Sequence, residues 1–199
     1  MLIVFPRPRR PRFPQPMRWS LDPRCPPPSR FIAAVDVRSA KFLSGQPPFI
    51  RRRKSTGRFA VGIRYEREVL DHLSLLALGV PSVELRLGPW LEFVDKRGRR
   101  WCQPDAVLSD RKTGIHIIYE VKYQFTSDAW WQLKWLYLPV LEKLLQGPIG
   151  LIQICRWYDP ASLFPEKYDL TKDPFKIPHA DRVAVHIWDA KRSRRAEAL

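Results

Sequence analysis

Two acids and a lysine stand out in this chain by their types and their spacing. The stretch from Trp101 to Gln124 reads WCQPDAVLSDRKTGIHIIYEVKYQ. It contains Pro104-Asp105, then fourteen residues, then Glu120-Val121-Lys122. Because successive side chains of a strand point to opposite faces, Glu120 and Lys122 share one face of any strand that carries them. Two carboxylates and an ammonium group are therefore expected to converge.

The chemistry that this set can do is phosphodiester hydrolysis. Two neighbouring carboxylates repel each other, and burying them costs several kcal/mol unless a cation lies between them. Mg²⁺ is such a cation, since it takes one or two carboxylates and completes its shell with water and phosphate; Mn²⁺ is expected to substitute for it. A nearby lysine can orient the attacking water or offset charge on the phosphate.

A hairpin is predicted to carry these groups. Its first strand covers Trp101–Val107 and includes Pro104-Asp105, a polar turn runs from Ser109 to Gly114, and the second strand covers Ile115–Lys122. The alternative is an exposed aspartate at a strand end with a Glu-Lys pair on a solvated strand face. The apolar residues of the second strand argue against an exposed edge.

A third acid is expected to approach from a helix that precedes the hairpin. The pattern predicts a helix from Gly62 to Leu78, ended by Gly79 and Pro81. Glu66 lies one turn before Leu70 on the apolar stripe of this helix. Glu66 is therefore expected to join the site. The alternative is a surface ion pair with a cation four residues later, but position 70 is leucine.

The other predicted elements complete a mixed sheet flanked by helices. A helix is expected over Ala129–Gln146, begun by Thr126-Ser127-Asp128 and bent at Pro139. Three tryptophans on it favour the core over base stacking. The expected strands are Val83–Leu87, Trp90–Val94, Ile149–Trp157 and Val183–Trp188, with a tight turn at Asp95–Gly98. Residues 30–43 are expected to form a short strand or helix, and residues 158–181 a loop.

These motifs resemble those of the PD-(D/E)xK nuclease superfamily, whose fold is restriction-endonuclease-like. The order of a helical glutamate, a PD motif and an EVK strand is most similar to the catalytic domain of TnsA-type transposon endonucleases. The resemblance covers residues 59 to 157. It implies that Asp105, Glu120 and Glu66 hold the metal ion and that Lys122 acts on water or phosphate. In RecB-like members a glutamine opens a Q-x-x-x-Y pattern; here Gln132 is followed by tyrosine at position 137, so the match is imperfect.

The positive charge of the chain is concentrated in its N-terminal third. Residues 1–60 contain 14 Lys or Arg and 2 Asp or Glu, whereas residues 61–199 contain 21 and 18. A proline- and arginine-rich arm of this kind is typical of a phosphate-contacting tail. Two alternatives for this arm stay open. It could be a solvated leader without a partner, or an anchor to a protein assembly. The residues expected to contact nucleic acid are Arg51, Arg52, Arg53, Lys54, Arg58, Lys96, Arg97 and Gln124.

Several classes of protein are disfavoured by the composition. No apolar run reaches the length of a membrane span, and the first residues do not form a secretory signal. The three cysteines, at positions 25, 102 and 155, have neither a disulfide nor a zinc-ligand spacing and fit a reducing interior.

The sequence therefore predicts an α/β protein in three parts. An extended basic arm covers residues 1–58, a nuclease-like domain 59–190 and a C-terminal tail 191–199. The expected function is a Mg²⁺-dependent DNA endonuclease of a mobile element or phage, located in the cytoplasm or a virion. Its partners would be DNA and, by the resemblance, a transposase, targeting or virion protein. The alternative is a non-catalytic DNA-binding or assembly protein on the same fold.

Overall fold

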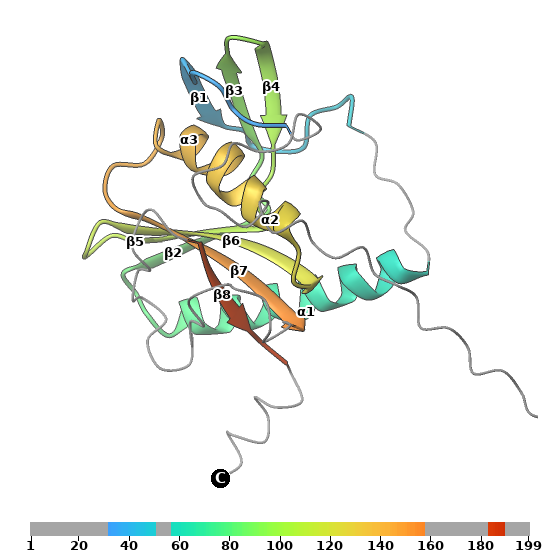
Figure 1. Ribbon diagram of the computed structural model, residues 1–199. Coiled ribbons are helices and arrows are strands. Elements are labelled where there is room, and N and C mark those ends of the chain that lie inside the picture. Colours follow the sequence, from blue (N-terminus) through green and yellow to red (C-terminus); the bar gives the residue numbers. More distant parts are fainter. Residues whose placement is uncertain (1–31, 51–56, 158–182, 190–199) are drawn as a thin grey trace, which may run out of the picture.

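The computed structural model describes residues 32–50, 57–157 and 183–189, and these form a mixed α/β protein with two sheets (Figure 1). The larger sheet has five strands in the order β2-β5-β6-β7-β8. On one side of β6 the strands run antiparallel, and on the other side β6, β7 and β8 run parallel. The strands are β2 (Val83–Leu87), β5 (Ala106–Asp110), β6 (Ile115–Gln124), β7 (Ile149–Trp157) and β8 (Val183–Ile187).

Helices cover both faces of this sheet (Figure 1). Helix α1 (Arg58–Leu78) lies on one face and buries Tyr65, Val69 and Leu73 against it, at the spacing of one helical stripe. The other face is covered by α2 (Ser127–Trp131), the π-helical segment η2 (Gln132–Tyr137) and α3 (Leu138–Leu141). The fold class predicted from the sequence is confirmed at this level, a mixed sheet flanked by helices.

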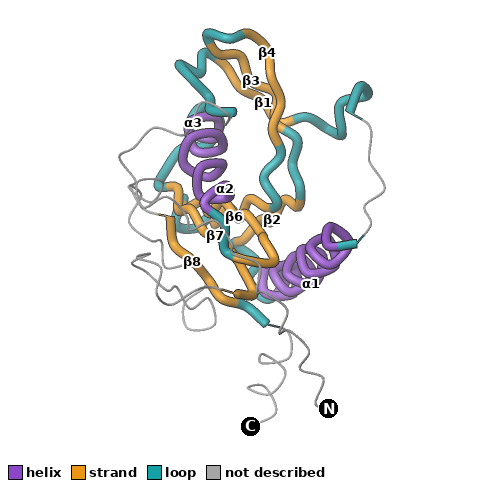
Figure 2. Tube along the Cα trace, turned by 45° about the vertical axis from the view of Figure 1, so that its right-hand side comes forward, coloured by secondary structure: helices purple, strands orange, loops and turns teal. Residues whose placement is uncertain are grey.

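A second, three-stranded sheet stands apart from the large one, beyond α3 (Figure 2). It has the order β1-β3-β4, all antiparallel, from β1 (Ser39–Phe42), β3 (Leu91–Asp95) and β4 (Gly98–Cys102). The strand predicted over Trp101–Val107 is therefore wrong. The chain leaves the small sheet after Cys102 and enters the large one at Ala106, because Pro104 cannot donate to a ladder.

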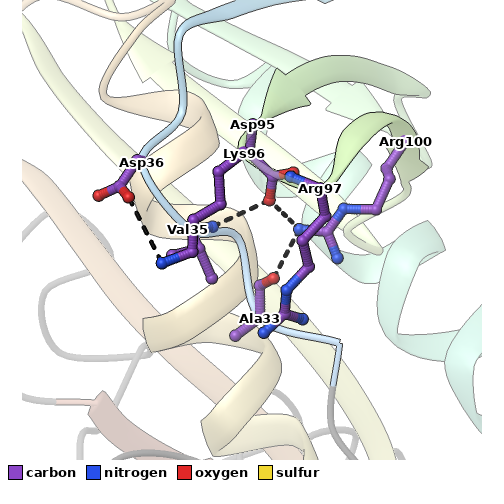
Figure 3. A network of polar contacts seen from close by, with 7 residues as sticks. All are labelled: Ala33, Val35, Asp36, Asp95, Lys96, Arg97 and Arg100. Atoms are coloured by element: carbon purple, nitrogen blue, oxygen red, sulfur yellow. Dashed lines mark hydrogen bonds and ion pairs between the residues drawn. The ribbon is translucent and has the colours of Figure 1, made fainter.

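A buried aspartate fastens the N-terminal described segment to the small sheet (Figure 3). The carboxylate of Asp95 accepts the backbone N–H groups of Val35 (3.0 Å) and Arg97 (2.8 Å) and forms an ion pair with Arg100. The Arg100 guanidinium also donates to the carbonyl oxygen of Ala33 (2.6 Å). Part of the segment predicted as an arm, residues 33–42, thus packs on the folded unit, where β1 is its short strand.

The helix predicted over Ala129–Gln146 is interrupted. The Thr126 side chain caps it as expected by accepting the N–H of Asp128 (3.1 Å). The α-helical hydrogen bonding gives way to a π-helical segment before Pro139, which lacks the N–H that would reach the carbonyl of Trp135. That carbonyl instead accepts the N–H of Ala34 (2.8 Å). The last helical turn ends at Leu141, five residues before the predicted end.

Most other elements are where the sequence predicts them, within a few residues. The predicted turn from Ser109 to Gly114 is shorter, because β5 continues through Asp110. The Asp110 carboxylate accepts the N–H of Lys112 (3.0 Å) and the hydroxyl of Thr113 (2.6 Å), which closes the turn. Strand β6 covers Ile115–Gln124, and Tyr123 and Gln124 continue it beyond Lys122 as the sequence predicts. The predicted loop 158–181 and the tail 191–199 lie outside the described residues.

Candidate active site

Asp105 and Glu120 face each other across neighbouring strands. In the β5–β6 ladder Ala106 pairs with Tyr119 and Val107 with Ile118, so Asp105, one residue earlier, stands opposite Glu120. Both acids lie on the face of the sheet that α2, η2 and α3 cover, which also holds Val107 and Ile118. The convergence predicted from the motif spacing is confirmed, although the aspartate precedes its strand of the large sheet instead of ending one.

The side chain of Asp105 completes the ladder at the point where Pro104 interrupts it. Its Oδ2 atom accepts the backbone N–H of Val121 at 2.6 Å. Its backbone carbonyl accepts the N–H of Gly88 from the other neighbouring segment (2.7 Å). Burial raises the pKa of the Asp105 carboxyl, against the lowering effects of Lys122 and of the Val121 N–H. Asp105 is thus held by backbone contacts on both sides.

Glu120 is a buried acid that is paired with Lys122. Only 2% of Glu120 is exposed, and its Oε1 forms an ion pair with the ammonium group of Lys122, two residues along the same face of β6. Burial, then the charge of Asp105, raise the pKa of Glu120. Burial would lower the pKa of Lys122, but the surrounding carboxylates raise it. The Lys122 side chain is 34% exposed and so connects the buried acids with solvent.

Glu66 comes to these residues from α1. It follows the buried Tyr65 and is itself half-buried. Burial and then the charge of Asp105 raise the pKa of Glu66, and the charge of Lys122 lowers it. Three acids from three elements therefore lie within electrostatic reach of one lysine. With all three acids ionised, their formal charge exceeds that of Lys122, so the site favours the binding of a further cation.

A tyrosine that the sequence singled out only as an imperfect match belongs to the site. Tyr137 is buried, and its hydroxyl donates to the carbonyl oxygen of Gln103 (3.1 Å), two residues before Asp105. Burial and the charge of Glu120 raise its pKa well above the usual range. In a π-helix, residues five apart are hydrogen-bonded neighbours. Gln132 and Tyr137 are five residues apart, so the π-helical segment places them on the same side of η2. In an α-helix, residues four apart have this relationship.

A divalent cation fits the donor set of this site. Within the described ranges, no group of three or more His, Cys, Asp or Glu side chains is arranged to hold a metal ion, so Glu66 does not form a three-ligand cluster with the other two acids. The Oε2 atom of Glu120, however, is buried without a hydrogen-bond partner among the described residues. Mg²⁺ in proteins is usually bound by one or two carboxylates, and water and phosphate complete its coordination shell. Asp105 and Glu120 can supply these carboxylate ligands.

The residues predicted to contact nucleic acid are placed unevenly. The cluster 51–54 and the side chain of Arg58 lie outside the described part of the chain. Lys96, at the tip of the β3–β4 hairpin, forms an exposed ion pair with Asp36 (3.6 Å). Arg97 at the same tip has no ion-pair partner within the described residues, and Gln124 is exposed at the end of β6.

Comparisons of this chain with protein-family models, with curated proteins and with solved structures give no match. None of the helices in the described ranges is long and apolar enough to cross a membrane. The fold and the site therefore carry the functional argument by themselves.

Proposed function

We propose that this chain is a Mg²⁺-dependent deoxyribonuclease of the PD-(D/E)xK type, with a restriction-endonuclease-like domain. One observation carries the proposal: Asp105, the residue before β5, stands opposite Glu120 of β6, and Lys122 forms an ion pair with Glu120 beside them. The mixed sheet with a helix on each face supports the same proposal, since that is the architecture the motif resemblance implies.

Each residue has a distinct task in this proposal. Asp105 and Glu120 would hold the cation, and Glu66 adds negative charge from α1. Bound there, Mg²⁺ would polarise the phosphodiester and lower the pKa of a bound water. Lys122, whose side chain is partly exposed and pairs with Glu120, would offer its ammonium group to stabilise charge on the phosphate. The buried backbone contacts of Asp105 keep the pair in place without substrate.

The charge distribution supports DNA as the substrate in this proposal. A mobile element or phage enzyme acting on DNA would use the basic residues 1–58 to bind the phosphate backbone. A transposase, targeting or virion protein would direct it to its site, as the resemblance to TnsA-type endonucleases implies.

Cleavage of defined DNAs tests the proposal. The purified full chain is incubated with supercoiled, linear, branched and single-stranded DNA, in Mg²⁺, in Mn²⁺ or in EDTA. Cleavage is expected only with a divalent cation, and Glu120→Gln should abolish it. Glu142→Gln, which changes an exposed acid on the helical side, serves as the matched control and should cut normally. Activity in EDTA, or wild-type cleavage by Glu120→Gln, would overturn the assignment.

A further inference from the structure

Gln153 is a buried polar side chain in the middle of an otherwise apolar strand. It lies in β7 between Ile152 and Ile154 and is fully buried. Neither its carboxamide oxygen nor its nitrogen has a hydrogen-bond partner among the described residues. Leaving a buried amide unsatisfied costs on the order of 1–3 kcal/mol. A strand that packs well with isoleucine on either side gains nothing for its stability from this glutamine.

The position of Gln153 is beside the candidate active site. In the parallel β6–β7 ladder Gln153 pairs with Glu120, and the strands of a sheet lie about 4.8 Å apart. The preceding pair on the same face, Ile118 and Leu151, packs under the helical layer. Asp105, Glu120 and Gln153 therefore form one polar row across the segments of β5, β6 and β7. The adjacent row on the same face is apolar and consists of Val107, Ile118 and Leu151.

The unsatisfied atoms of this row are chemically complementary. Oε1 of Glu120 is occupied by Lys122, whereas Oε2 is buried and has no partner among the described residues. The hydroxyl of Tyr137 donates to the carbonyl oxygen of Gln103 at 3.1 Å, and the Tyr137 side chain also lies close enough to interact with the Glu120 carboxylate. The carboxamide of Gln153 offers two N–H donors on the neighbouring strand, which is what a carboxylate oxygen accepts.

We propose that Gln153 is a positioning residue of this site, whose carboxamide N–H group donates to Oε2 of Glu120 when a divalent cation occupies the carboxylate pair. The bond fixes the orientation in which Glu120 meets the cation. This inference rests on the proposed nuclease function and extends its machinery to β7. Hydrogen-bond partners that orient metal-binding side chains typically contribute 10–100-fold to metal affinity or activity.

Cation affinity tests this role directly. Gln153→Met keeps the length of the side chain and removes both polar atoms. Isothermal titration of the full chain with Mn²⁺ is expected to show ~10–100-fold weaker binding than wild type. Its free energy of unfolding in EDTA should be equal or higher, because an unsatisfied amide has been removed. A glutamine with a purely structural role would show the opposite, a less stable protein with unchanged Mn²⁺ affinity.

Two further variants make the test specific. Val185→Ala, on the strand next to Gln153 in the same row, is the matched control and should lose stability while keeping its Mn²⁺ affinity. Gln153→Glu places a third carboxylate beside Glu120, so Mn²⁺ should raise its melting temperature by more than it raises that of the wild type. The same rise as in the wild type would mean that position 153 is remote from the cation.

The outcomes separate this inference from the proposed function. Wild-type protein that binds no Mn²⁺ would overturn both. Wild-type protein that binds Mn²⁺ and cuts DNA, together with Gln153→Met that binds Mn²⁺ within twofold of wild type, would overturn the positioning role alone.

Discussion

The carboxylate of Asp105 accepts the backbone N–H of Val121, the residue between Glu120 and Lys122. One acid thus has two tasks, since it accepts a backbone N–H of β6 just before β5 begins and it supplies charge to the site. Substitutions at position 105 therefore affect stability and chemistry separately, and the choice of replacement decides which effect is seen.

Asp105→Asn should abolish cleavage and preserve the fold, because an amide oxygen can still accept the Val121 N–H. Asp105→Ala should be equally inactive but less stable than Asp105→Asn by about 1 kcal/mol, since a buried N–H loses its partner. Urea unfolding in EDTA compares the two variants. Equal unfolding free energies would show that the ladder contact contributes nothing.

The stability of the cation-free protein should fall as pH rises from about 4.5 to about 8, because burial and Asp105 raise the pKa of Glu120 from 4.5 to about 8. In this window the folded state binds more protons than the unfolded state, so deprotonation favours unfolding. Glu120→Gln should flatten the profile and be more stable at pH 8. Glu66 and Asp105, whose pKa values are also raised, leave a residual slope.

Unfolding free energies measured between pH 4 and pH 9 in EDTA check this prediction. Glu142→Gln, which removes an exposed acid, is the control and should follow the wild-type profile. A Glu120→Gln profile as steep as that of the wild type would contradict the assignment of the pH dependence to Glu120.

Lys122→Ala should bind Mn²⁺ but cut DNA ~10²–10³-fold more slowly, the usual effect of removing one positioned electrostatic group from a transition state. Single-turnover cleavage at saturating DNA measures the chemical step. Lys112→Ala, in the exposed β5–β6 turn, should cut at the wild-type rate. A loss of less than about tenfold in Lys122→Ala would make the lysine a structural counterion only.

Removing residues 1–31, which contain seven arginines and one aspartate, should weaken DNA binding without altering the site. The deletion stops before the segment that Asp95 and Trp135 hold, so β1 is retained. Each lost phosphate contact reduces the slope of log K against log salt by about 0.9. DNA-binding titrations at several salt concentrations measure that slope. An unchanged slope would make a protein partner the better candidate for this segment.

Local patterns were enough to predict the pair at the centre of the site. The two-residue alternation of strands and the hairpin predicted that Asp105 and Glu120 converge on one face, whereas their direct pairing depends on β5 continuing through Asp110. Periodicity also predicted helix α1, in which Glu66 lies beside the buried stripe of Tyr65, Val69 and Leu73. The break between the two sheets at Pro104 was missed, because the residues on either side of it, Trp101 and Val107, both suit strands.

What the sequence did not reveal depends on contacts between distant segments. The π-helical segment follows from Pro139 and from Ala34, which takes the freed carbonyl of Trp135. Gln153 lies inside the predicted strand Ile149–Trp157, and its neighbours in the sequence do not indicate that it pairs with Glu120. Parallel pairing of β6 with β7 is set by the crossover through three helical segments, and this register is not visible in either strand alone.

The place of β6 in the sheet has a consequence for how the site fluctuates. This strand is bonded on both sides, to β5 and to β7, and both of its faces are covered by helices. Exposing Glu120 by local opening would break two ladders at once, so its amide should exchange with solvent deuterium only through global unfolding. The carboxylates would then be ordered without any bound substrate. Control of the proposed nuclease would have to act on access to the partly exposed Lys122, because unfolding the site would unfold the protein.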